Sequence, residues 1–196
     1  MKELTTVTGR AVSLPDADID TDIIYPARFL LITEKKGLGA YAFYDRRSDP
    51  GFPFRENDDR PILIAGPNFG CGSSREQAPW AIGDMGIRVI IAESFGEIFY
   101  SNCFRNGMLP IRLNGQIVEA LRLRAEAGDT ITVDLASQLI IAQDLPALGF
   151  DIAEDRREAL LKGWNDTTRI LALHGDDISA FEATQRRTSP WLWQRN

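Results

Sequence analysis

Hydrophobic and polar positions alternate in two different ways along the chain. The first half has short apolar runs separated by turns rich in Gly and Pro, and the second half has apolar runs that alternate with amphipathic stretches. Residues 6–14 alternate as in a strand that Pro15 ends, whereas residues 116–127 carry apolar side chains at helical spacing up to Gly128. The pattern predicts strands at 6–14, 61–65, 88–93, 109–113, 130–135 and 138–143.

Helices and loops follow from the same periodicity. Residues 29–39 mix apolar and polar side chains with glycines and are expected to form a mobile loop or a short helix, and residues 45–61 a long surface connection. One helix is predicted to begin near Ser74, a second to span 95–106 with Gly107 as a left-handed cap, and a third to span 116–127. The remainder of the chain, to about Gln185, is predicted to be helical with a break near Asn165.

The order of these elements predicts an α/β fold. Strand, Gly-rich turn, helix, strand, helix and strand follow one another from residue 61 to 113, a pattern typical of parallel strands with helices packed on the sheet. We expect one domain over residues 1–196, with β/α layers around a mostly parallel sheet and a helical extension from about residue 151. Ligands in such sheets bind at the carboxyl ends of strands, and the turn after Ala65 lies at such an end.

Composition and charge narrow the possible partners. The 196 residues include 22 Lys and Arg against 28 Asp and Glu, so the formal net charge is −6. An acidic chain without a long basic run does not suit nucleic-acid binding, and no apolar run approaches the roughly 20 residues of a membrane helix. Cys71 and Cys103 follow no signal-peptide stretch and are expected to be free thiols in a reducing cytoplasm.

The turn after Ala65 carries the candidate chemistry. Gly66, Gly70 and Gly72 allow positive φ angles and close approach of a ligand, and two serines and Arg75 follow them. Hydroxyls and free amides at a helix start bind anions, and a guanidinium in the first helical turn can hold a carboxylate through two hydrogen bonds. An ordinary N-cap serine beside a surface arginine remains the alternative reading of the same residues.

Three common uses of such a turn fail on specific residues. A phosphate-binding P-loop needs a Lys, and none occurs between Pro61 and Trp80. A dinucleotide fingerprint needs a small residue where Arg75 stands. A nucleophile elbow needs Gly-x-Ser-x-Gly, which is absent, and the only histidine, His174, is expected to cap a helix end.

Several blocks of the sequence resemble one known family. NFGCGSSREQAPWA, DTDIIYPARFL and SFGEIFYSNCFRNGMLPI are similar, in the right order, to blocks of the small subunits of 3-isopropylmalate dehydratase. DDISAFEATQRRTSPWL resembles the closing helix and tail of that family, so the resemblance covers nearly the whole chain. The family is the detached swivel domain of the aconitase superfamily, which implies a swivelling-domain fold of the aconitase C-terminal type.

The resemblance implies a hydro-lyase activity and roles for individual residues. The expected reaction interconverts 2-isopropylmalate and 3-isopropylmalate by dehydration and rehydration, in leucine biosynthesis. By family analogy Ser73 is the base that removes a proton beside a carboxylate, Arg75 binds a substrate carboxylate, and Ser74 supports it. Asp22 and Arg28 are expected to line the pocket from the other side. Gln77 stands where many relatives carry His, and its amide can form hydrogen bonds but cannot titrate.

The resemblance also implies a partner and a cofactor outside this chain. A 4Fe-4S cluster is expected on a separate large subunit, because the two cysteines of this chain cannot supply its three thiolate ligands. The two subunits are expected to form a heterodimer or a heterotetramer. Leu31 and Ile32, in the loop after PAR, are the hypothesis for the wall that faces the isopropyl group, with simple core packing as the alternative. Alternative functions are a related hydro-lyase acting on citraconate or citramalate, dimethylmaleate or homoaconitate, or a dicarboxylate-binding module without catalysis.

Overall fold

The computed structural model describes residues 1–32, 34, 36–54 and 58–193. The chain divides into two compact units, Met1–Gly163 and Trp164–Asn196. This boundary divides the helical stretch expected from about residue 151. The reason is that Leu160 is fully buried in the core of the first unit, where its carbonyl accepts a hydrogen bond of 3.0 Å from the amide of Leu4.

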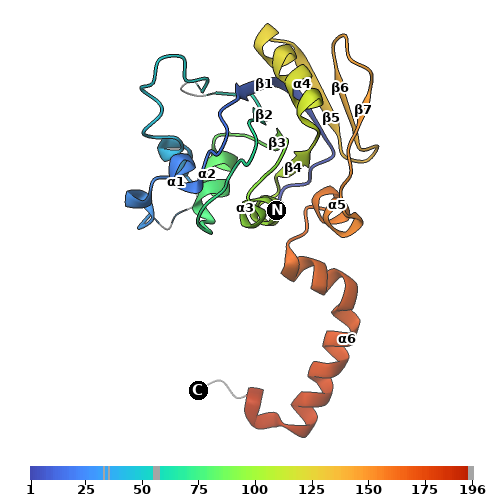
Figure 1. Cartoon of the computed structure of the whole chain (residues 1–196). Helices are drawn as coiled ribbons and strands as arrows, with labels where there is room; N and C mark the ends of the chain where they lie inside the picture. Colours follow the sequence, from blue (N-terminus) through green and yellow to red (C-terminus); the bar gives the residue numbers. More distant parts are fainter. Residues whose placement is uncertain (33, 35, 55–57, 194–196) are drawn as a thin grey trace. The chain divides into compact units, whose positions relative to one another are not determined.

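A seven-stranded sheet forms the centre of the first unit, in the order β4-β3-β2-β1-β5-β6-β7 (Figure 1). β1 to β4 pair in parallel, and β1, β5, β6 and β7 pair antiparallel, so β1 joins the two halves. The α/β class and the strands predicted at 130–135 and 138–143 are confirmed, and these two strands pair antiparallel. The strands are β1 (Thr6–Leu14), β2 (Ile62–Ala65), β3 (Val89–Ala92), β4 (Leu109–Arg112), β5 (Thr130–Asp134), β6 (Leu139–Ala142) and β7 (Leu148–Gly149).

The parallel strands are short and apolar because both of their faces are covered. Alternate side chains of β2 enter two different hydrophobic clusters: Leu63 and Ala65 join one, and Ile62 and Ile64 join the other. All four of these side chains are at most 2% exposed. This is the continuous apolar run that a strand buried on both faces requires, in contrast to the alternation in β1.

Helices cover the two faces of this half. α1 and α2 contribute to the cluster with Leu63, whereas α4 and α5 contribute to the cluster with Ile62, and Figure 1 shows α1 and α2 on one side of the sheet and α4 on the other. Gly107 and Gly128 have φ angles of 74° and 83°, as predicted for left-handed caps. The helices of this unit are α1 (Thr21–Ile24), α2 (Gln77–Asp84), α3 (Glu97–Arg105), α4 (Gly115–Ala127) and α5 (Glu154–Leu161), with 3-10 turns η1 (Ala27–Phe29) and η2 (Leu38–Tyr41).

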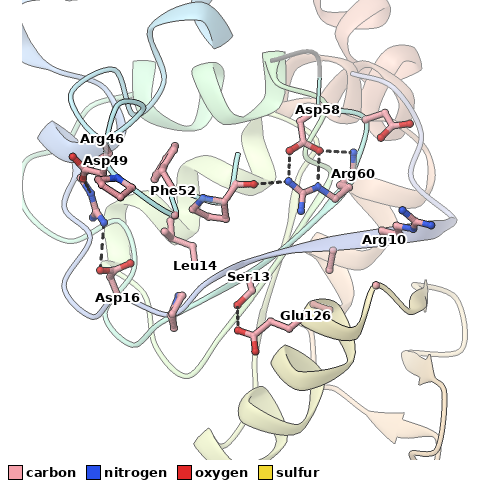
Figure 2. A pocket seen from close by; sticks show the side chains of 18 residues that line it. Arg10, Ser13, Leu14, Asp16, Arg46, Asp49, Phe52, Asp58, Arg60 and Glu126 are labelled. Carbon is pink, nitrogen blue, oxygen red and sulfur yellow. Dashed lines mark hydrogen bonds and ion pairs between the residues drawn. The ribbon is translucent and has the colours of Figure 1, made fainter. Parts of the chain in front are cut away.

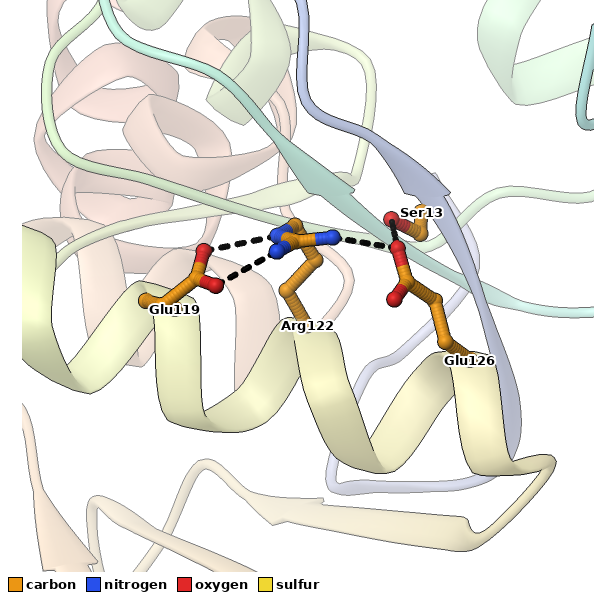
Figure 3. Close-up of polar contacts among 4 residues, drawn as sticks. All are labelled: Ser13, Glu119, Arg122 and Glu126. Carbon is orange, nitrogen blue, oxygen red and sulfur yellow. Dashed lines mark hydrogen bonds and ion pairs between the residues drawn. The ribbon is translucent and has the colours of Figure 1, made fainter.

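A polar network ties α4 to the central strand. Arg122 donates hydrogen bonds to Glu119 and to Glu126 on the same helix, and the Ser13 hydroxyl of β1 donates to the Glu126 carboxylate at 3.1 Å (Figure 3). The Arg122 guanidinium lowers the pKa of Glu119 by hydrogen bonding to it. The ends of β1 and α4 are therefore linked through one carboxylate.

The second unit consists of α6 (Asp166–Thr188) and the 3-10 turn η3 (Pro190–Trp193). The expected break near Asn165 is confirmed, since Asn165 caps α6 in a reciprocal capping box with Thr168. α6 contains two helical segments that meet at a kink at His174, whose φ of −130° and ψ of 17° are not helical, so His174 lies at the end of the first segment as expected. None of the helices within the described residues is both long and apolar enough to cross a membrane.

Candidate active site

The Gly-rich turn leaves the carboxyl end of β2 in a conformation that needs its glycines. Gly70 and Gly72 have φ angles of 72° and 88°, as the sequence predicted. A Cβ at Gly70 would lie 2.2 Å from the ring of Phe99 on α3, and one at Gly66 would lie 2.2 Å from the carbonyl oxygen of Asp16. The turn is therefore packed closely against its neighbours.

Segments that follow β1 and β3 hold the turn on both sides. The amide of Gly70 donates to the carbonyl of Ile19 at 2.7 Å. On the other side, the amide of Asn68 donates to the Ser94 hydroxyl at 2.8 Å, and the amide of Gly96 donates to the carbonyl of Phe69 at 3.0 Å. The carboxyl ends of three adjacent parallel strands thus meet at this turn, where open α/β sheets place their ligands.

The helix start predicted near Ser74 is wrong. α2 begins at Gln77 and not near Ser74, so the two serines precede the helix and Arg75 lies outside its first turn. Pro79 explains the difference, because proline has no N–H to donate and is tolerated only near a helix start. A helix from Ser74 would place Pro79 in its interior. Anion binding by Ser73 and Ser74 through the helix amides is therefore not supported.

The turn holds its serines outward and its arginine against α1. Ser73 and Ser74 are exposed, whereas the Arg75 side chain is only 16% exposed. Nη1 of Arg75 donates a hydrogen bond to the carboxylate of Asp22, whose side chain is 51% exposed. In the hydrogen bonds that the structure describes, Arg75 uses Nη1 alone, which leaves the edge formed by Nε and Nη2 for a second carboxylate.

α1 also contacts the turn through its first residue. The hydroxyl of Thr21 donates to the carbonyl of Ser73 at 2.9 Å, and the amide of Thr21 donates to the carbonyl of Cys71 at 2.9 Å. Thr21 itself is 2% exposed. Sequence reasoning named Asp22 but missed Thr21, because a threonine that opens a short helix carries no signal of a partner 52 residues away.

Arg28 is held at a different place. It lies on η1, where both terminal nitrogens of its guanidinium donate to the Asp45 carboxylate, and it stacks over the rings of Phe29 and Tyr44 at 4.7 and 5.3 Å. Hydrogen bonding to Asp45 raises the pKa of Arg28 and lowers that of Asp45. Among the described contacts, none joins Arg28 to the turn, so the structure brings Asp22 to Arg75 but not Arg28.

The two apolar candidates of the loop differ sharply. Leu31 is 92% exposed, whereas Ile32 is half-buried and packs against the hydrophobic cluster that contains Leu63. Part of this loop, residues 33 and 35, lies outside the described residues. Only Leu31 therefore projects freely from the chain, while Ile32 contributes to the core.

The cysteines do not fit an iron–sulfur cluster. Both are free; Cys103 is fully buried on α3, and Cys71 lies in the turn. Burial first, and then Asp20 and Asp18, raise the pKa of the Cys71 thiol, so it is not poised as a thiolate ligand. Within the described residues no three His, Cys, Asp or Glu side chains form a group suited to a metal ion.

A cavity lies elsewhere, between β1, residues 46–53 and 58–60, and the end of α4. Its volume is about 740 Å³, and Figure 2 shows that Arg46 and Arg60 pair with aspartates of the lining, whereas Arg10 is drawn without such a contact. Arg46 binds Asp49 and Asp16 at 2.7 and 3.4 Å. Arg60 binds Asp58 through both Nε and Nη2. Arg46 and Arg60 therefore already use their Nε and Nη2 edges, whereas Arg10 has no side-chain partner among the described contacts. The turn at Arg75 is the candidate site because it lies where the carboxyl ends of the parallel strands meet.

Two family models match separate parts of the chain. A model described as the aconitase C-terminal domain matches residues 1–116, and one described as the C-terminal domain of the 3-isopropylmalate dehydratase small subunit matches residues 173–193. The second match lies entirely within the second unit. The first match lies within the first unit, so each unit contains one of the two matched ranges.

Individual relatives and a solved structure point the same way. The 3-isopropylmalate dehydratase small subunit of Rhodospirillum centenum is 46% identical, with 97% of this chain and 98% of that protein covered. The 3-isopropylmalate dehydratase of Rhizopus niveus is 42% identical over 98% of this chain but only 27% of its own length. A crystal structure of 3-isopropylmalate dehydratase from Methanocaldococcus jannaschii is 28% identical, with a TM-score of 0.65 and coverage of 92% of this chain and 99% of that one.

Proposed function

The chain belongs to the family of 3-isopropylmalate dehydratase small subunits, and on that premise we propose that it supplies the base and one carboxylate-binding group of an isopropylmalate isomerase. The reaction interconverts 2-isopropylmalate and 3-isopropylmalate by dehydration and rehydration, in leucine biosynthesis. The observation that carries the proposal is the pairing of an exposed Ser73 with a positioned Arg75 on one packed turn at the carboxyl edge of the sheet.

Ser73 and Arg75 have complementary tasks. The Oγ atom of Ser73 accepts the proton from the carbon next to a substrate carboxylate, and returns it on rehydration. Loss of that proton builds negative charge on the carboxylate, so the Nε and Nη2 edge of Arg75 stabilises the transition state more than the ground state. The positive charge of Arg75, two residues along, also favours the alkoxide form that Ser73 needs in order to act as a base. Ser74 supports substrate binding beside them.

The remaining parts of the site come from a partner. We assign the 4Fe-4S cluster to a separate large subunit, in a heterodimer or heterotetramer in the cytoplasm, because the two cysteines of this chain do not fit a cluster. The Rhizopus niveus relative supports this assembly, since this chain aligns with only 27% of a longer dehydratase. The exposed serines of the turn suit a site that a second protein completes.

Substrate choice is assigned to the loop after η1. Leu31, 92% exposed, is the proposed wall for the isopropyl group, and Ile32 supports it from the core. Arg28, fixed by Asp45, is proposed to line the same side of the completed pocket. A related diacid such as citraconate or dimethylmaleate is the alternative substrate, because one methylene discriminates by only about 1–3 kcal/mol.

Reconstitution with the large subunit tests the function. We expect the two proteins to co-purify and to hydrate the unsaturated diacid, and Ser73→Ala to lose most of the turnover while the complex still forms. Ser48→Ala, at an exposed serine of the 45–61 connection, serves as the matched control and keeps wild-type turnover. Dicarboxylate binding without turnover would instead identify a binding module, and near-wild-type activity of Ser73→Ala would remove the serine from the base role.

A further inference from the structure

Thr21 occupies an unusual position for a polar side chain. Among the described residues, Thr21 and Asn102 are the buried polar ones, with exposures of 2% and 5%. A buried hydroxyl costs free energy unless it is hydrogen-bonded, and that of Thr21 donates to the carbonyl of Ser73 at 2.9 Å. The contact joins residues that are 52 positions apart, and it is not one of the backbone hydrogen bonds that form a helix or a sheet.

The carbonyl that Thr21 holds controls where Ser73 points. The carbonyl of Ser73 belongs to the peptide plane shared with Ser74, so holding this oxygen restricts the backbone rotation that aims the Ser73 side chain. Ser73 follows Gly72, which has a φ of 88°, and α2 begins only at Gln77. No helical hydrogen bond therefore fixes this peptide. The second contact, from the amide of Thr21 to the carbonyl of Cys71, holds the turn on the other side of Gly72.

Two adjacent residues of α1 thus hold two groups of the turn. Thr21 binds the Ser73 carbonyl, and Asp22 binds the Arg75 guanidinium. Because Thr21 and Asp22 are adjacent in the sequence, the same short helix contacts both the Ser73 backbone and the Arg75 side chain. Threonine suits this task, since its branched Cβ restricts χ1 and keeps the hydroxyl in one direction.

We propose that Thr21 is a positioning residue for catalysis, which holds the Ser73 backbone so that its Oγ meets the substrate in register with Arg75. The inference rests on the proposed function, in which Ser73 is the base. It adds that the position of the Ser73 hydroxyl relative to the Arg75 guanidinium is set by contacts from α1 and not by the turn alone. Misplacement of a reacting group by about 1 Å costs on the order of 100-fold in rate.

Substitutions of Thr21 in the complex with the large subunit test this assignment. Thr21→Val keeps the shape and removes the hydroxyl, and is expected to lower kcat by about 10- to 100-fold with little change in KM. Thr21→Ser keeps the hydroxyl and should retain kcat within about 3-fold of wild type. Thr21→Ala, measured alongside, removes the hydroxyl without placing a methyl group against the carbonyl, in case the valine variant does not assemble. Thr132→Val removes a hydroxyl pair of 3.0 Å with Thr8 on the antiparallel half and is the matched control.

A second readout does not depend on activity. In the isolated chain, the backbone amide order parameters of Ser73 and Ser74 should fall from about 0.85 toward loop values below about 0.6 in Thr21→Val and Thr21→Ala, and remain high in Thr21→Ser and Thr132→Val. Unchanged order parameters would overturn the proposal, as would unchanged kcat in both hydroxyl-free variants. A rise in KM that accounts for the whole loss would also overturn it.

The double variant separates this inference from the proposed function. If Thr21 acts through Ser73, Thr21→Val should lower the residual kcat of Ser73→Ala by much less than it lowers that of the wild type. An equal factor in both backgrounds would show that Thr21 acts through something else. If Ser73→Ala is as active as wild type, the base assignment fails. If Ser73→Ala is inactive and Thr21→Val is fully active, only the role of Thr21 fails.

Discussion

The carboxylate of Asp22 holds the guanidinium of Arg75 across 53 positions of sequence. Asp22 lies on α1, after β1, and Arg75 lies in the turn after β2, so the contact crosses between the loops of two neighbouring parallel strands. The Arg75 side chain is 16% exposed and that of Asp22 is 51% exposed. The contact limits the rotamers of a long side chain before any substrate arrives, so binding requires less ordering.

Removal of the Asp22 carboxylate is expected to impair catalysis through Arg75. In the complex with the large subunit, Asp22→Ala should lower kcat/KM by about 10-fold or more, because the released guanidinium loses its orientation. Asp22→Asn keeps a carbonyl acceptor and should lose less. Steady-state kinetics check both variants, with Asp49→Asn as control, since Asp49 pairs with Arg46 at 2.7 Å outside the turn. Wild-type kinetics for Asp22→Ala would contradict the orienting role.

Replacement of Gly70 by alanine should destabilise the first unit strongly. A left-handed φ costs a non-glycine residue about 1–2 kcal/mol, and the added Cβ would also lie 2.2 Å from the Phe99 ring. Gly51→Ala is the matched control, because Gly51 has a φ of 81° with nothing within 4 Å of an added Cβ. Thermal unfolding should show a clearly larger decrease in Tm for Gly70→Ala than for Gly51→Ala. Equal decreases would show that the contact with Phe99 relaxes without cost.

Leu31 and Ile32 should respond differently to truncation. Leu31→Ala removes a side chain that is 92% exposed, so we expect an unchanged Tm but a lower preference for isopropylmalate over smaller diacids. Ile32→Ala should lower Tm, because Ile32 packs against the core. A panel of substrates and a melting curve for each variant separate the two effects. An unchanged substrate preference in Leu31→Ala would exclude Leu31 from the substrate wall.

Alkylation of Cys71 should be slow at neutral pH. Its thiol pKa is raised by burial and by Asp20 and Asp18, and the thiolate is the reactive form. At neutral pH, the rate of reaction with iodoacetamide should therefore be lower for Cys71 than for free cysteine. As the pH increases, the rate for Cys71 should continue to rise above the pH at which the rate for free cysteine becomes constant. Cys71→Ser identifies the signal, since Cys103 is fully buried and should react only on unfolding. Fast alkylation at neutral pH would contradict the raised pKa.

Local pattern was sufficient for much of the fold. Strands buried on both faces appear as continuous apolar runs, and the caps at Gly107 and Gly128 follow from the preference of glycine for positive φ. The α/β class could therefore be predicted from residues 61–143 alone. The helix does not begin near Ser74 as predicted, because the cost of Pro79 in a helix interior outweighs the capping preference of serine.

The sequence by itself determined the α/β class, the strands β1 to β6, the glycines of the turn and the candidate residues Ser73, Arg75 and Asp22. Only the tertiary structure decided that Asp22 holds Arg75, that Thr21 holds Ser73, and that Arg28 is bound to Asp45 instead. The physical reason is one of range. Helices, strands and caps depend on neighbours within a few residues, whereas the two contacts between α1 and the turn depend on which strands become adjacent in the sheet and how their loops then pack.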